Sequence, residues 1–112
     1  MAITNKVSKP ALSPEWQAAA TDLSGDGAAG TTGITLCSKA GAQAVSLADG
    51  AYNGQMAIII ANGTGANTVT PASILGDSAT TVVDTKETGV FVWYSDGGSN
   101  EGWACVQGVA GS

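Results

Sequence analysis

The feature that most limits the fold is the succession of short apolar segments and turn residues in the middle of the chain. Residues 44–48 alternate in polarity, with Val45 and Leu47 on one face. The pair Asn53-Gly54 follows, and both of its residues tolerate the positive φ that a tight turn needs. The run Met56–Ala61 is then continuously apolar, as in a central strand buried on both faces. This stretch predicts strands joined by turns.

Further segments of the same kind continue to the C-terminus. They alternate in polarity or are rich in β-branched and aromatic residues, and they cover residues 34–38, 67–70, 80–84, 89–95 and 103–109. Pro71 ends one of these strands or marks a sheet edge, because proline has no N–H to donate. About seven short strands at fairly regular spacing predict an all-β fold, a small antiparallel sandwich or barrel. No exact internal repeat is visible.

The N-terminal part has a different character. Residues 1–32 follow neither a helical nor a strand period, so we expect an extended arm there and the β domain at residues 33–112. Ser13 and Pro14 would suit the start of a short helix that reaches Leu23 at most. Large apolar residues in the arm are sparse, among them Ile3, Val7, Leu12 and Trp16. An arm of this kind packs on something else instead of forming its own core.

Aromatic residues gather in the last two expected strands, which residues 96–100 join as a hairpin. They are Phe91, Trp93, Tyr94 and Trp103. In strict alternation Phe91 and Trp93 share one face, while Tyr94 shares the other with two valines. Both faces are therefore apolar. One would cover the core, and the other needs a second cover such as another subunit, the arm or a ligand. Exposed aromatic rings also stack on sugars, which leaves a carbohydrate-binding patch as an alternative.

The charge content restricts the partners and the chemistry. Charged residues make up 12% of the chain, about half the usual share, and a weakly charged surface favours association with other copies or another protein. The net charge is −5, and the chain has neither histidine nor arginine. Nucleic-acid binding is not expected, since phosphate and guanine contacts depend on Lys and Arg. Without histidine, the commonest general base and a common metal ligand are also missing.

No set of residues predicts catalysis or a bound cofactor. The acidic residues mostly fall in or beside expected turns, and no serine or cysteine has a histidine partner. Asp22 and Asp26 begin a sequence like the first half of a calcium loop, but Gly33 stands where the bidentate glutamate belongs. A flexible acidic linker is the alternative interpretation. We therefore expect no enzyme activity, no cofactor and no metal site.

Cys37 and Cys105 each lie in an expected strand. A bridge between them would close a long loop and contribute about 4 kcal/mol. The absence of an export signal favours two buried thiols instead. The longest apolar run, Met56–Ala61, is too short to span a bilayer. We expect no membrane partner, and synthesis in a cytoplasm before assembly with another component.

Several segments of the β region carry a family resemblance. They are Gly41–Gly50, Asn53–Gln55, Asn67–Ala72, Thr80–Val82 and Gly102–Val106. In these segments the chain resembles small virion proteins of tailed bacteriophages, the capsid decoration and head-fibre proteins. The resemblance covers about two-thirds of the chain and rests on a pattern of strands and turns. The two cysteines and the arm are not part of it.

The resemblance implies a β domain in a homotrimer on the outside of a capsid, made in the host cytoplasm. The partner would be the major capsid protein, and the arm, through Ile3, Val7, Leu12 and Trp16, would grip the shell. The alternative is a receptor- or glycan-binding domain of a phage fibre that uses the aromatic hairpin. A fibre subunit normally carries a long repetitive shaft, and this sequence contains none.

Overall fold

The described part of the chain is built from strands alone. The computed structural model describes residues 20–75 and 80–106, and these form nine strands and no helix. The strands are β1 (Ala20–Leu23), β2 (Gly27–Ala28), β3 (Gly33–Cys37), β4 (Gln43–Leu47), β5 (Met56–Ala61), β6 (Asn67–Pro71), β7 (Thr81–Val83), β8 (Thr88–Ser95) and β9 (Glu101–Val106). The all-β class is confirmed, and β3 to β9 lie where the sequence predicts strands.

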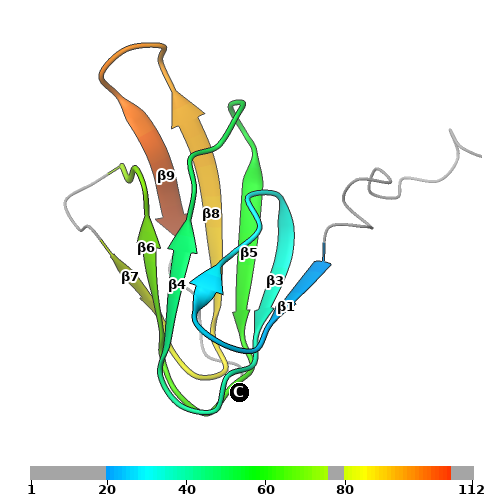
Figure 1. Cartoon of the computed structure of the whole chain (residues 1–112). Helices are drawn as coiled ribbons and strands as arrows, with labels where there is room; N and C mark the ends of the chain where they lie inside the picture. Colours follow the sequence, from blue (N-terminus) through cyan, green and yellow to red (C-terminus); the bar gives the residue numbers. More distant parts are fainter. Residues whose placement is uncertain (1–19, 76–79, 107–112) are drawn as a thin grey trace, which may run out of the picture.

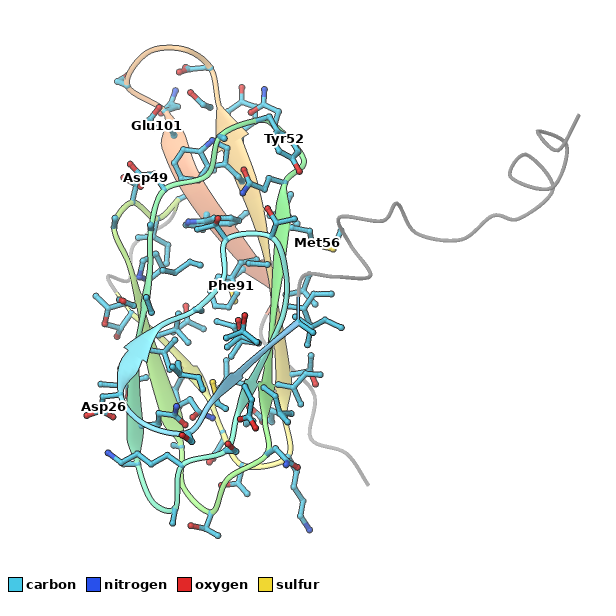
Figure 2. The ribbon with its side chains drawn as sticks, turned by 45° about the vertical axis from the view of Figure 1, so that its right-hand side comes forward. Asp26, Asp49, Tyr52, Met56, Phe91 and Glu101 are labelled. Atoms are coloured by element: carbon cyan, nitrogen blue, oxygen red, sulfur yellow. The ribbon has the colours of Figure 1, made fainter. Side chains whose placement is uncertain are left out.

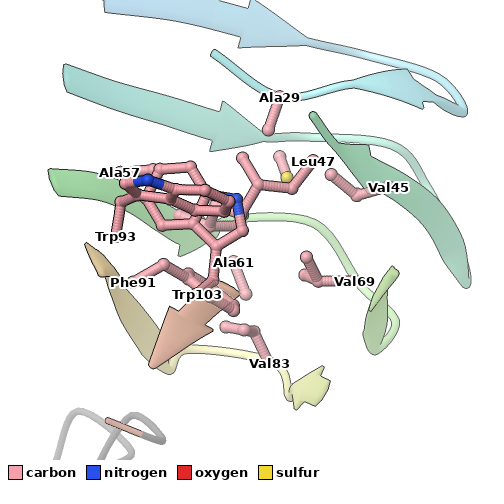
Figure 3. Close-up of a cluster of buried hydrophobic side chains, with 12 residues drawn as sticks. Ala29, Val45, Leu47, Ala57, Ala61, Val69, Val83, Phe91, Trp93 and Trp103 are labelled. Atoms are coloured by element: carbon pink, nitrogen blue, oxygen red, sulfur yellow. The ribbon is translucent and has the colours of Figure 1, made fainter. Parts of the chain in front are cut away.

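The strands form two sheets that face each other (Figure 1). Sheet A has the order β1-β3-β5-β8-β9, and sheet B has the order β2-β4-β6-β7. The first six strands alternate between the sheets, so the chain winds around the core. The core itself lies between the sheets, where both of them contribute buried side chains (Figure 3).

The winding path explains why the sheets are mixed and not antiparallel as expected. Each of the first strands crosses to the opposite sheet instead of folding back beside its predecessor. Neighbours within a sheet are therefore two strands apart in the sequence, and they run parallel in β1-β3-β5 and in β2-β4-β6. Antiparallel pairing begins only with β7, β8 and β9. The predicted hairpin at residues 96–100 joins β8 and β9.

The winding also contains a structural repeat. Ile34 pairs with Ile58 and Val45 pairs with Val69, a spacing of 24 residues in both sheets. The turns stack with the same spacing. Gly65 lies so close to Gly41, 24 residues earlier, that a Cβ on Gly65 would overlap the backbone at Gly41. Identical residues recur at only some of the equivalent positions. The repeat becomes visible once the strand register is known.

Buried amides connect successive turns of the winding. Gln43 in β4 lies opposite Asn67 in β6, and both are almost completely buried. The Gln43 Nε2 donates to the carbonyls of Leu23 (2.8 Å) and Gly25 (2.7 Å), and the Asn67 Nδ2 donates to the carbonyl of Val83 (3.2 Å). Each buried amide thus has hydrogen-bond partners in the backbone of a neighbouring segment.

The sheets begin earlier than the expected domain boundary at residue 33. Strands β1 and β2 lie within the segment expected to be an arm, and Ala20–Leu23 is a strand where the longest expected helix would have ended. The backbone of β1 pairs with β3, and Leu23 packs against the core. This pairing depends on a strand elsewhere in the sequence, which local patterns do not reveal. The rest of the expected arm and helix, residues 1–19, lies outside the described residues.

Candidate interaction surface

Three of the four hairpin aromatics belong to the core. Phe91 and Trp103 have no exposed surface and Trp93 is 4% exposed, so they are not surface aromatics. Figure 3 shows them between the sheets. They are buried because β8 and β9 turn this face toward sheet B, where Leu47 and Val69 complete the core. Tyr94, on the opposite face of β8, is 46% exposed.

The outer side of sheet A is apolar. We call it the outer A face, and it comprises Ile34, Leu36, Met56, Ile58, Ile60, Val90 and Val92. These side chains alternate with the buried ones along β3, β5 and β8, so they point away from the core. In Figure 2, Met56 points outward while Phe91 lies between the sheets. Ile34 is 37% exposed, and the other six are partly buried.

The strand register arranges these side chains in rows across the sheet. The middle row runs through Ala20, Ile34, Ile58 and Val90, from β1 to β8. A second row pairs Met56 with Val92. Apolar side chains directly opposite each other on neighbouring strands pack together. The result is a continuous apolar surface.

The outer side of sheet B is different in character. Ala44, Ser46, Thr68 and Thr70 alternate there with buried residues along β4 and β6, so mostly small and hydroxyl side chains meet the solvent. Val82 of β7, opposite Thr68, is the exposed large apolar side chain on this side. The hollows on this side are open and lie beside Asp26 and Ala44. An apolar sheet face opposite a polar one is typical of a protein that binds another surface on one side.

Charge lies mainly outside the outer A face. Among the described sheet residues, Asp22 at the β1 edge is the charged side chain on this side, and its Oδ1 accepts a hydrogen bond from the Ser38 hydroxyl (2.7 Å). An uncharged apolar face loses little hydration energy when another surface covers it. The face is thus suited to a contact that excludes water.

The two acidic residues of the calcium-like sequence have separate partners. Asp26 Oδ1 accepts hydrogen bonds from the backbone N–H of Ala44 (2.9 Å) and the ammonium of Lys39 (3.0 Å). These donors, the Ala44 N–H first, hold the pKa of Asp26 below its usual value. Asp22 interacts with Ser38 instead. In residues 20–75 and 80–106, no three acidic or cysteine side chains come together as metal ligands would.

Both cysteines are free thiols. Cys37 in β3 and Cys105 in β9 are separated by β5 and β8, or three strand spacings of about 4.8 Å each. A disulfide requires Cα atoms within about 7 Å, so no bridge can form. Burial raises the pKa of each thiol above its ordinary value.

The sequence left most of the outer A face unassigned. The apolar residues Val90 and Val92 pointed to an additional cover for β8, but β3 and β5 were not connected with them. One signal was available in the sequence. The strand Met56–Ala61 carries apolar residues on both of its faces, and only one face can point into the core. The predicted arm contacts Ile3, Val7, Leu12 and Trp16 all lie outside the described residues.

The comparisons with known proteins place the chain in no family. No protein-family model matches the sequence, and no curated protein is significantly similar to it. In the part of the chain that the structure describes, no helix is long and apolar enough to cross a membrane.

Proposed function

We propose that this protein is a structural virion protein that binds the outer surface of a phage capsid as a decoration protein. It works by binding alone, as a homotrimer, with the major capsid protein as its partner. The observation that carries this proposal is the outer A face, because an extended uncharged apolar sheet surface marks a contact with another protein. The resemblance to phage decoration and head-fibre proteins supplies the identity of the partner.

The N-terminal segment supplies the capsid contacts in this proposal, through Ile3, Val7, Leu12 and Trp16. Burial of each large apolar side chain contributes about 1.5–3 kcal/mol. A trimer presents three such segments to the shell at once, so weak individual contacts add up to tight binding. The low charge content of the chain supports a surface that is largely covered after assembly.

The fibre alternative has less support. A glycan site on the hairpin would need exposed rings, and Phe91, Trp93 and Trp103 are buried. Tyr94 and Tyr52 are the exposed aromatics that remain among the described residues. They keep this alternative testable without favouring it.

The test is co-sedimentation of the protein with purified capsids of the phage that encodes it, prepared without the protein. We expect saturable binding, and a native mass in solution of three times the 11.0 kDa chain. An Ile3→Ser, Val7→Ser double variant should lose the binding. The matched control is Ser46→Ala on the polar outer side of sheet B, which should bind normally. Equal occupancy of the double variant and the wild type would refute the capsid contacts.

A further inference from the structure

We propose that Asn62 is a site of spontaneous modification, where the side-chain amide reacts with the backbone of Gly63 and is converted to aspartate and isoaspartate. The chain contains two Asn-Gly pairs, at opposite ends of β5. Asn53-Gly54 precedes the strand and Asn62-Gly63 follows it. The fold protects the first pair and leaves the second free to react. This modification is separate from the proposed function and does not depend on it.

The reaction requires water as its only second reactant. The backbone nitrogen of the following residue attacks the asparagine Cγ and forms a C–N bond with it. The side-chain nitrogen leaves as ammonia, with the proton that the backbone N–H gives up. Water then opens the succinimide ring at either of its two carbonyl groups, which gives aspartate or isoaspartate. A following glycine favours the attack, because it has no side chain to hinder the approach of its nitrogen.

Hydrogen bonds hold both reacting groups of Asn53-Gly54. The Asn53 Oδ1 accepts a hydrogen bond from the backbone N–H of Ser95 (2.6 Å), and the Gly54 N–H donates to the carbonyl of Trp93 (3.0 Å). Both partners belong to β8, so this pair is fixed to the neighbouring strand of sheet A. Each bond must break before the attack, and each slows the reaction about fivefold. Together they predict a rate about 10 to 30 times lower than that of a free pair.

The reacting groups of Asn62-Gly63 are not held in this way. Within residues 20–75 and 80–106, neither the Asn62 side-chain amide nor the Gly63 N–H makes a hydrogen bond. Asn62 is exposed, so water reaches the succinimide. The Asn62 N–H donates to the carbonyl of Cys37 (2.8 Å), a bond that involves neither reacting atom. The second pair is therefore the one that reacts in the folded protein.

The products change the turn between β5 and β6. Aspartate adds one negative charge to a chain whose net charge is −5. Isoaspartate also inserts the former Cβ into the backbone. The turn is closely packed there, because a Cβ on Gly63 would overlap the carbonyl of Lys39, and the Gly41 N–H donates to the Thr64 Oγ1 (2.8 Å). Isoaspartate should therefore loosen the stacking of successive turns, and the altered form should accumulate with the age of the protein.

The experiment is a time course of the folded, full-length protein in mildly alkaline buffer, followed by mass spectrometry. Cleavage at Met56 separates the two pairs into different fragments, and the replacement of NH2 by OH gives the mass increase. Fragmentation by electron transfer distinguishes isoaspartate from aspartate. We expect product at Asn62 first, at a rate about 10 to 30 times that at Asn53. An Asn62→Gln variant should remove the early product, since the longer side chain closes its ring slowly, and leave Asn53 unchanged.

Urea provides the matched control. It removes the hydrogen bonds to β8, so both pairs should then react at similar rates. Equal rates at Asn53 and Asn62 in the folded protein would overturn the inference. So would a rate ratio that is the same with and without urea, or product at Asn62 that forms only in urea. Because no capsid is present, failure of the proposed function would leave these readouts unchanged.

Discussion

The indole rings of Trp93 and Trp103 meet edge to face, with centroids 5.4 Å apart and planes inclined at 68°. The Trp103 Nε1 also donates a hydrogen bond to the carbonyl of Ala48 (2.8 Å), in the loop that follows β4. Gly50, in the same loop, lies directly against the Trp93 ring. The aromatic pair therefore fixes the β8–β9 hairpin of sheet A to a loop that leaves sheet B.

Truncation of Trp103 should be strongly destabilising. Trp103→Ala removes a fully buried ring, its edge-to-face contact and the hydrogen bond to Ala48, and we expect a loss of about 3–5 kcal/mol in the free energy of unfolding. Trp103→Phe keeps part of the packing and should cost less. Urea unfolding followed by circular dichroism measures both. A loss below about 1 kcal/mol for the alanine variant would contradict this role, and the exposed Thr70→Ala should stay within about 0.5 kcal/mol of the wild type.

A methyl group at residue 50 should also be poorly tolerated. The Cβ of a Gly50→Ala variant would overlap the Trp93 ring, so the loop or the ring must move, at a cost of about 1–3 kcal/mol. Gly25→Ala is the matched control, because a Cβ there meets no atom within 4 Å. We expect thermal unfolding to show a lower midpoint for Gly50→Ala and an unchanged or slightly higher one for Gly25→Ala. Equal midpoints would mean that the close approach is not needed.

The pKa of Asp26 predicts a stability change in acid. Its carboxylate accepts hydrogen bonds from the Ala44 N–H and the Lys39 ammonium, and its pKa lies below the unfolded value of about 4. The unfolded state then binds its proton first as the pH falls. The stabilisation is therefore complete above about pH 4 and is lost as the pH drops through the folded pKa.

The Asp26→Asn variant tests this linkage. Its free energy of unfolding should depend less on pH in acid than that of the wild type. Asp96 serves as a comparison, because its pKa is also lowered, by the Gly98 N–H first and by hydrogen bonds within the β8–β9 turn. Urea unfolding at several pH values below 5 gives the slopes. Parallel curves for the wild type and Asp26→Asn would show that Asp26 contributes nothing.

The thiols should be protected in the native protein. Cys37 is completely buried and Cys105 is partly buried, and burial raises the pKa of both, so little thiolate is present at neutral pH. We expect Ellman's reagent to titrate two thiols in denaturant and to react slowly with the native protein, most slowly at Cys37. Cys37→Ser and Cys105→Ser variants assign the rates. A single oxidised band with no free thiol would contradict the separation of β3 and β9.

Strands β3 to β9 were predictable because their signals are local. Met56–Ala61 has the length and composition of a central strand, and the turn at residues 96–100 identifies the last hairpin. Strands β1 and β2 were not predictable in this way. They are four and two residues long, and each pairs with a strand that comes later in the sequence, β1 with β3 and β2 with β4. The parallel direction likewise depends on the crossing between sheets, which no single segment encodes.

The candidate surface was only partly visible in the sequence. The alternation of β8 correctly placed Phe91 and Trp93 on one face of the strand and Tyr94 on the other. It did not indicate which of these two faces lies toward the core. That choice depends on where sheet B packs. The continuity of the outer A face depends in turn on the register that brings Ile34, Ile58 and Val90 into one row. Both are long-range properties, and the structure supplies them.

The most direct test of the central claim is electron cryo-microscopy of the phage capsids with and without added protein. We expect additional density on the outer capsid surface, at regular positions and in groups of three, that accommodates the two-sheet fold of residues 20–106. Its N-terminal side should face the shell. Capsids with no added density, together with density for the protein on a tail fibre, would contradict the decoration role and support the fibre alternative.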